Sequence, residues 1–68
     1  MAKSSVLSEA IHNEKTFRIE FGGEEVGYYL YVLVDGRCTH DYLQDTMQFA
    51  KEYASELFGV PLDAWVDA

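Results

Sequence analysis

Cys38, His40 and Asp41 have the residue types and the spacing that come closest to catalytic chemistry in this sequence. A thiol and an imidazole one residue apart can act as nucleophile and base, and a nearby carboxylate can orient the imidazole. Such a pair also needs an enclosing pocket, which a chain of 68 residues seldom provides. We therefore predict that the protein is not an enzyme, that Cys38 is a small buried apolar residue and that His40 is exposed in the first turn of a helix.

Metal and nucleotide sites are not expected either. A structural zinc site normally has four Cys or His ligands, and this chain has one cysteine and two histidines, His12 being the second imidazole. Gly22 and Gly23 could open a phosphate-binding loop, but Glu24 and Glu25 follow them directly and would repel a phosphate. The sequence therefore predicts no metal and no other cofactor.

A carboxylate stripe is the second group of residues with chemical potential, and it consists of Asp41, Asp45, Glu52 and Glu56. In an α-helix these side chains and Gln48 fall within about 80° of one another, because successive residues turn by about 100°. The two pairs at i,i+4 bring like charges together, and each pair destabilises a helix by roughly 0.2–0.5 kcal/mol. The ~6 Å between paired residues is similar to the spacing of phosphates along a nucleic-acid strand. The stripe is either an ordinary solvated helix face or a surface that mimics nucleic acid.

The net charge of −7 is concentrated in the C-terminal part of the chain. Residues 1–40 carry six acids and four bases, whereas residues 41–68 carry six acids and one base, Lys51. Direct binding to nucleic acid or to an anionic membrane is not expected, since each requires a cationic surface. A basic protein surface is the predicted partner, and plain solubility is the alternative role of the acidity.

The segment from Tyr28 to Val34 predicts a strand with two apolar faces. Tyr29, Tyr31 and Leu33 alternate with the residues that point the other way, and one helix covers only one face of a sheet. Either the N-terminal segment or the tail around Trp65 covers the second face, or Tyr29 and Tyr31 belong to a partner-binding or homodimer interface. Tyrosines are enriched at such interfaces.

The remaining elements follow from local patterns. Residues 16–21 alternate as a strand, residues 22–27 form a turn or loop, and residues 28–34 form the second strand of an antiparallel hairpin, which Asp35 and Gly36 end with a further turn. Ser4 or Ser5 could cap a short helix over residues 6–13, and Thr39 and Gly59 suit the two ends of a long amphipathic helix.

The predicted fold is α+β, with one domain over residues 1–68. It has a flexible or helical segment 1–15, a β-hairpin over 16–38 with room for a short third strand at Arg37 and Cys38, a helix over 39–59 and a tail over 60–68. The predicted core is Phe17, Ile19, Phe21, Leu30, Val32, Leu43, Met47, Ala50, Ala54 and Leu57.

A cytoplasmic location is predicted because a single cysteine suits a reducing compartment. The N-terminus also lacks the apolar run of a signal peptide, and no segment approaches membrane-spanning length.

In its length, its acidity and its carboxylate stripe, the chain resembles the class of small phage-encoded inhibitors to which anti-CRISPR proteins belong. Some members of that class cover a DNA-binding channel with an acidic surface, so the resemblance implies a basic channel of a nucleoprotein complex as the partner. The residues expected to bind this partner are Asp41, Asp45, Glu52, Glu56, Glu24 and Glu25. The alternatives are an antitoxin-like or immunity-like module that uses Tyr29 and Tyr31, and a housekeeping domain whose acidity serves solubility alone.

Overall fold

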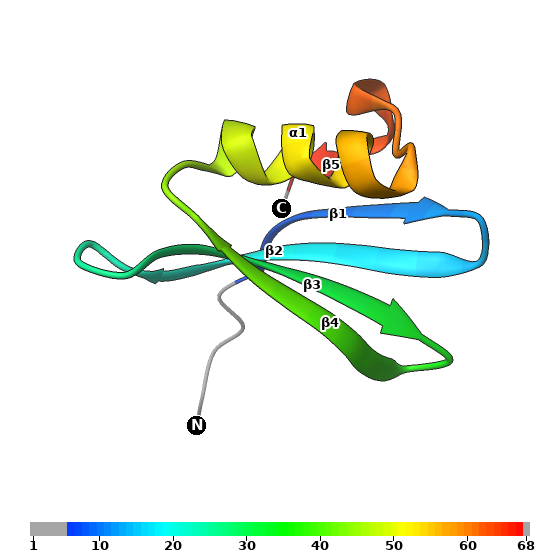
Figure 1. Ribbon diagram of the computed structural model, residues 1–68, viewed down its shortest axis with the longest axis horizontal. Helices are drawn as coiled ribbons and strands as arrows, with labels where there is room; N and C mark the ends of the chain where they lie inside the picture. The colour runs from blue at the N-terminus through cyan, green and yellow to red at the C-terminus, as the bar shows by residue number, and fades with distance from the viewer. Residues whose placement is uncertain (1–5, 68) are drawn as a thin grey trace.

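A five-stranded antiparallel sheet with one α-helix across one of its faces forms the structure (Figure 1). The computed structural model describes residues 6–67, so the predicted cap at Ser4 or Ser5 lies outside the described residues. The elements, in chain order, are β1 (Val6–His12), β2 (Lys15–Gly23), β3 (Gly27–Val34), β4 (Arg37–Gln44), α1 (Met47–Phe58), the short 3-10 helix η1 (Leu62–Ala64) and β5 (Val66–Asp67). The predicted α+β class is confirmed.

The sheet has the order β4-β3-β2-β1-β5, so the first four strands form a meander. The predicted hairpin of β2 and β3 is confirmed, with Phe17 opposite Val32 and Ile19 opposite Leu30. Asp35 and Gly36 form the predicted turn, and both have positive φ, at 53° and 78°, as the tight turn of a two-residue hairpin requires.

The helix predicted over residues 6–13 is wrong, because this segment forms β1. A helix of this length is marginal in water, since it closes few hydrogen bonds for the entropy that nucleation costs. Pairing with β2 satisfies the backbone of the segment instead and places Ala10 opposite Phe17 in the core. Tertiary pairing therefore overrides the helix-like spacing of the apolar residues.

The predicted helix over 39–59 begins too early and the predicted third strand is too short. Residues 37–44 form the full strand β4, with Tyr42 opposite Leu30, and Thr39 caps nothing. The cap is Thr46, whose hydroxyl oxygen accepts a hydrogen bond of 3.0 Å from the backbone N–H of Phe49. The predicted C-terminal end is confirmed, since Gly59 has a φ of 73° and donates to the Ser55 carbonyl.

The core lies between α1 and the face of the sheet that α1 covers. Two small helix residues, Ala50 and Ala54, are fully buried against the sheet, and the rings of Phe17 and Phe58 lie 5.3 Å apart. The buried apolar residues are Ala10, Phe17, Ile19, Leu30, Val32, Ala50, Ala54, Val60 and Trp65. The list of predicted core residues omitted Ala10, Val60 and Trp65, and it wrongly included three residues that are 41–51% exposed, namely Phe21, Leu43 and Leu57.

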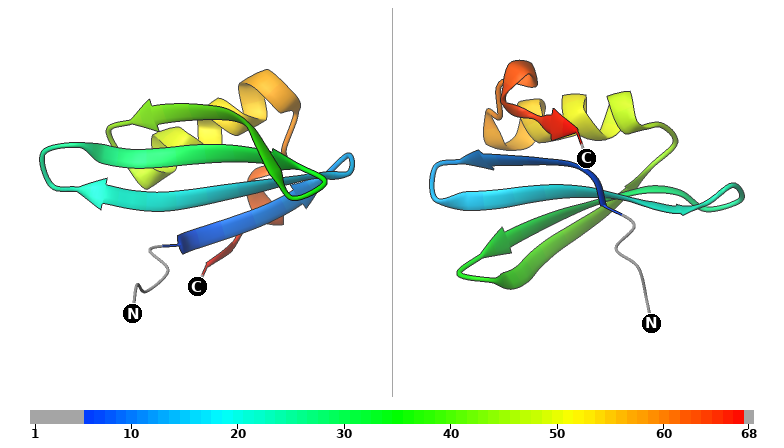
Figure 2. Two further views of the ribbon diagram at one scale, coloured as in Figure 1. Left: turned by 90° about the horizontal axis from the view of Figure 1, so that it is seen from below. Right: turned by 180° about the vertical axis from the view of Figure 1, so that it is seen from behind.

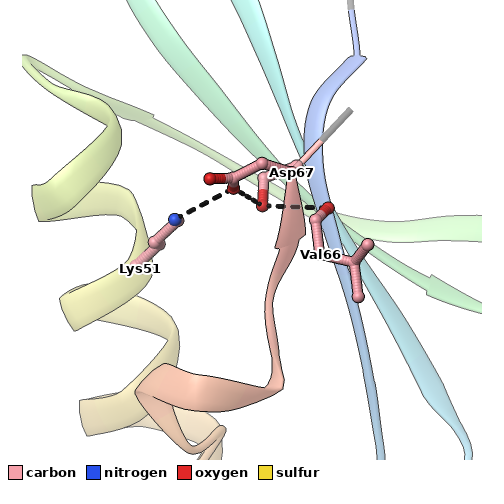
Figure 3. Close-up of polar contacts among 4 residues, drawn as sticks. Lys51, Val66 and Asp67 are labelled. Atoms are coloured by element: carbon pink, nitrogen blue, oxygen red, sulfur yellow. Dashed lines mark hydrogen bonds and ion pairs between the residues drawn. The ribbon is translucent and has the colours of Figure 1, made fainter.

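The end of the chain returns to the sheet. β5 pairs with β1, where Ser8 lies opposite Asp67. The buried hydroxyl of Ser8 donates to Asp67 Oδ1 at 2.7 Å, and Lys51 of α1 reaches the same oxygen at 3.2 Å (Figure 3). The strand of two residues is thereby tied to both the sheet and the helix.

Candidate protein-binding surface

The face of the sheet opposite α1 is covered by no helix or strand of residues 6–67 (Figure 2, left). Along β3, Leu30 and Val32 are fully buried under α1, so Tyr29 and Tyr31 point to the other side. Trp65 belongs to the core, and residues 6–12 of the N-terminal segment form β1, which only widens the sheet, so neither covers this face as one prediction required. Within residues 6–67, this face of the sheet is therefore open.

Strand register brings charged and aromatic side chains together on this open face. Tyr29 lies opposite Glu20 of β2 and Leu43 of β4, and Tyr31 lies opposite Asp41 of β4. The two tyrosine rings are stacked, with centroids 5.7 Å apart and an interplanar angle of 21°. We call this surface the tyrosine face, and it consists of Glu20, Tyr29, Tyr31, Leu33, Asp41 and Leu43.

Gly22 makes room for the first of these rings. A Cβ atom at Gly22 would lie 2.7 Å from Cε2 of Tyr29, which is closer than real Cβ contacts allow. The absence of a side chain at position 22 therefore permits the Tyr29 ring to lie where it does, beside Tyr31. The sequence prediction considered Gly22 only as part of a turn or of a phosphate-binding loop, and it missed this role.

The charges of the open face do not cancel. Arg18 Nε forms an ion pair with Glu9 Oε2 at 2.7 Å, whereas Glu20 and Asp41 have no ion pair within residues 6–67. Burial raises the pKa of Tyr31 above 10.0, and the charge of Glu20, followed by Tyr29, Asp41 and Cys38, raises it further. The hydroxyl of Tyr31 thus lies in a negative potential that would attract a cation.

The carboxylate stripe does not exist as a helical feature. Asp41 lies in β4 on the tyrosine face, and Asp45 is exposed in the connection between β4 and α1. Only Glu52 and Glu56 lie on the solvent side of α1, where Gln48 Nε2 donates to Glu52 Oε2 at 3.1 Å. The stripe prediction is wrong because it depended on a helix that starts at Thr39.

Glu24 and Glu25 are exposed in the turn between β2 and β3. The structure therefore divides the six predicted binding carboxylates among four places: the tyrosine face, the connection before α1, the outer side of α1 and the β2–β3 turn.

Cys38, His40 and His12 form no catalytic arrangement. Cys38 is exposed rather than buried as predicted, and its thiol donates to the backbone carbonyl of His40 at 3.4 Å and not to the ring. The His40 ring lies in β4 and contacts Tyr42 and Phe58 on the helix side, at centroid distances of 6.1 and 6.0 Å. His12 is separated from them by β2 and β3. Among residues 6–67, no three Cys, His, Asp or Glu side chains are grouped to hold a metal.

A hollow of about 310 Å³ lies where β1 and β2 meet η1 and β5, and it is lined by Glu9, Ala10, Ile11, Thr16, Ala64 and Val66. Its single charged residue, Glu9, is already paired with Arg18. It lacks the convergent polar groups that a catalytic or small-molecule site needs.

Comparisons with known proteins give no guide to function, so the tyrosine face is the main one. No protein-family model, curated protein or solved structure matches this chain. Among residues 6–67 there is also no helix with the length and apolar character needed to cross a bilayer.

Proposed function

We propose that this protein is a non-catalytic binding domain that attaches through its tyrosine face to a positively charged surface of another protein. The observation that carries the proposal is the position of two carboxylates, Glu20 and Asp41, on either side of the stacked Tyr29 and Tyr31, where neither forms an ion pair with any of residues 6–67. Aromatic residues supply contact area at protein interfaces, and complementary charge selects and steers the partner.

The net charge of −7 supports a basic partner, because it would repel acidic surfaces and speed association with cationic ones. Basic protein surfaces commonly bind nucleic acid. We therefore infer an inhibitor, similar in effect to anti-CRISPR proteins, that covers the nucleic-acid-binding surface of its partner in the cytoplasm.

The outer side of α1 is the second surface to consider, since Glu52 and Glu56 are exposed there and the last turn carries no base. Two carboxylates on one helix no longer reproduce an extended row of phosphates. We accordingly assign the main contact to the sheet and retain the helix as a comparison surface.

Charge reversal on each surface tests this assignment. The double variant Glu20→Lys, Asp41→Lys and the matched control Glu52→Lys, Glu56→Lys change the net charge equally, because each replaces two acids by two bases. Wild-type protein and both variants would be immobilised, exposed to bacterial lysate at low salt and eluted with a salt gradient, with mass spectrometry of the eluate. We expect a basic partner to be retained by the wild type and the control and lost from the sheet variant.

Occlusion is then measured directly with the purified partner. Fluorescence anisotropy of the partner's nucleic acid should fall when wild-type protein is added, because the two ligands compete. Loss of the partner from the helix variant alone would support a nucleic-acid mimic on α1. A wild-type dimer in light scattering that the sheet variant dissociates would mean that a second copy covers the tyrosine face.

A further inference from the structure

We infer that the tyrosine face selects arginine over lysine, with a guanidinium of the partner stacked on Tyr29 and Tyr31 and hydrogen-bonded to Glu20 or Asp41. This inference rests on the proposed function, since it names the chemical group by which the basic partner is recognised. It goes further in requiring a planar cation, whereas net charge alone would accept any cation.

The stacked rings favour a flat cation. The rings of Tyr29 and Tyr31 are nearly parallel and stacked, with centroids 5.7 Å apart and an interplanar angle of 21°, so a planar group can continue the stack. A guanidinium is planar and weakly hydrated, so it stacks on aromatic rings more readily than the compact, strongly hydrated ammonium of lysine.

The two carboxylates favour a cation that offers several donors. Glu20 belongs to β2 and Asp41 to β4, so they approach the tyrosine pair from opposite sides. An arginine fork can donate two parallel hydrogen bonds to one carboxylate while its plane remains on a ring. Arg18 of this chain lies opposite Tyr31, but it donates to Glu9 and not to either carboxylate of the tyrosine face.

Apolar residues complete the surface. Leu43 lies opposite Tyr29 and is 51% exposed, and Leu33 continues the same row of β3 side chains beyond Tyr31. These side chains can contact the methylene groups of a bound arginine, whose stem is apolar although its end is charged.

Three short peptides of equal length test the selection, and they carry arginine, lysine or citrulline at the same two positions between glycines. Binding to the full-length protein is followed by NMR through the amides of Glu20 and Asp41 and the rings of Tyr29 and Tyr31. The arginine peptide should bind about fivefold more tightly than the lysine peptide, as one exposed cation–π contact predicts. Citrulline, which is planar but uncharged, should bind more weakly than either.

Variants assign the effect to residues. Tyr31→Leu should remove the preference for arginine, Tyr31→Phe should retain it because the ring remains, and Glu20→Gln with Asp41→Asn should weaken both cationic peptides. Glu56→Gln is the control on α1 and should leave all three peptides unchanged. Thermal unfolding shows whether each variant is folded. If Tyr31→Leu unfolds, the inference is tested by Tyr31→Phe together with the double variant Glu20→Gln, Asp41→Asn.

Equal affinity for arginine and lysine, or a preference that survives Tyr31→Leu, would overturn the arginine inference while leaving the proposed function intact if the basic partner is still lost on charge reversal. A basic partner that ignores charge reversal of the tyrosine face would instead overturn the proposed function itself.

Discussion

Lys51 Nζ lies 3.2 Å from Asp67 Oδ1, and this ion pair joins the helix to the last strand of the sheet (Figure 3). Hydrogen bonds from Ser8 and Lys51, and the charge of Lys51, lower the pKa of Asp67 below 3.8. A lowered pKa means that folding favours the ionised carboxylate. Its contribution to stability is therefore present above the unfolded pKa and is lost as the pH falls through the folded pKa.

We predict that Asp67→Asn lowers the melting temperature at neutral pH, because the amide keeps an acceptor for Ser8 but loses the charge that attracts Lys51. The difference from the wild type should shrink as the pH falls below the unfolded pKa of 3.8, and it should vanish below the lower folded pKa, where the folded carboxylate is protonated. Asp63→Asn is the control, since Asp63 is exposed and forms no ion pair in the described part of the chain. Melting curves over a pH series measure the effect, and a difference that persists at the acid end would contradict it.

The start of α1 gives a second prediction. Thr46→Ala removes the oxygen that accepts from the Phe49 N–H, and it should lower the free energy of unfolding by about 0.5–2 kcal/mol. Thr46→Ser keeps the oxygen and should lose little. Denaturant unfolding followed by circular dichroism measures both, and equal stability of the Ala and Ser variants would contradict the assigned cap.

Local signals predicted the central hairpin but not the start of the helix. Alternation in residues 16–21 and 28–34 and the Asp35–Gly36 turn act over a few residues, so they can be read from the sequence. Residues 41–44 fit both the period of a helix and the pairing of a strand. Their pairing with β3 decides between the two, and that contact involves residues distant in the sequence.

The neighbours on the tyrosine face could not be predicted for a related reason. If β3 and β4 paired without a register shift from the pair Val34 and Arg37 onward, His40 would lie opposite Tyr31. The register instead shifts by one residue after Leu33, which pairs with Cys38, so that Asp41 lies opposite Tyr31. One extra residue in β4 thus exchanges an imidazole for a carboxylate beside the ring, and the sequence carries no clear signal for it.

Two glycines with similar backbone conformations give a matched pair of variants. Gly27 and Gly23 have φ values of 110° and 115°, so alanine should be strained at both by about 1–3 kcal/mol. A Cβ at Gly27 would also lie 2.6 Å from the backbone oxygen of Gln44. A Cβ at Gly23 would have no such neighbour within 4 Å. Gly27→Ala should therefore be clearly less stable than Gly23→Ala in denaturant unfolding. Equal losses would mean that β4 can move away from β3 at little cost.

Gly22→Ala should change the shape of the tyrosine face with little effect on the stability of the protein. The new methyl group would meet the Cε2–Cδ2 edge of the Tyr29 ring and a methyl group of Val26, and both side chains can rotate away, so the free energy of unfolding should change by less than about 1 kcal/mol. The Tyr29 ring should leave its stack with Tyr31, which NMR would detect as a change in the ring proton shifts of both residues. Unchanged shifts in a folded variant would contradict the role assigned to Gly22.

The hydroxyl of Tyr31 reports the potential of the tyrosine face. Because burial and the charge of Glu20, and then that of Asp41, raise the pKa of Tyr31, the folded protein favours the neutral phenol. Stability from this source is fully present below the unfolded pKa of 10.0 and is lost as the pH rises through the folded pKa. Tyr31→Phe should thus lose less stability than the wild type above about pH 10. Asp41→Asn and Glu20→Gln should each lower the Tyr31 pKa, measured as the phenolate absorbance that Tyr31→Phe lacks, and Glu56→Gln should leave it unchanged. A Tyr31 pKa that is the same in all three variants would mean that the two carboxylates do not raise it and create no negative potential for a cation.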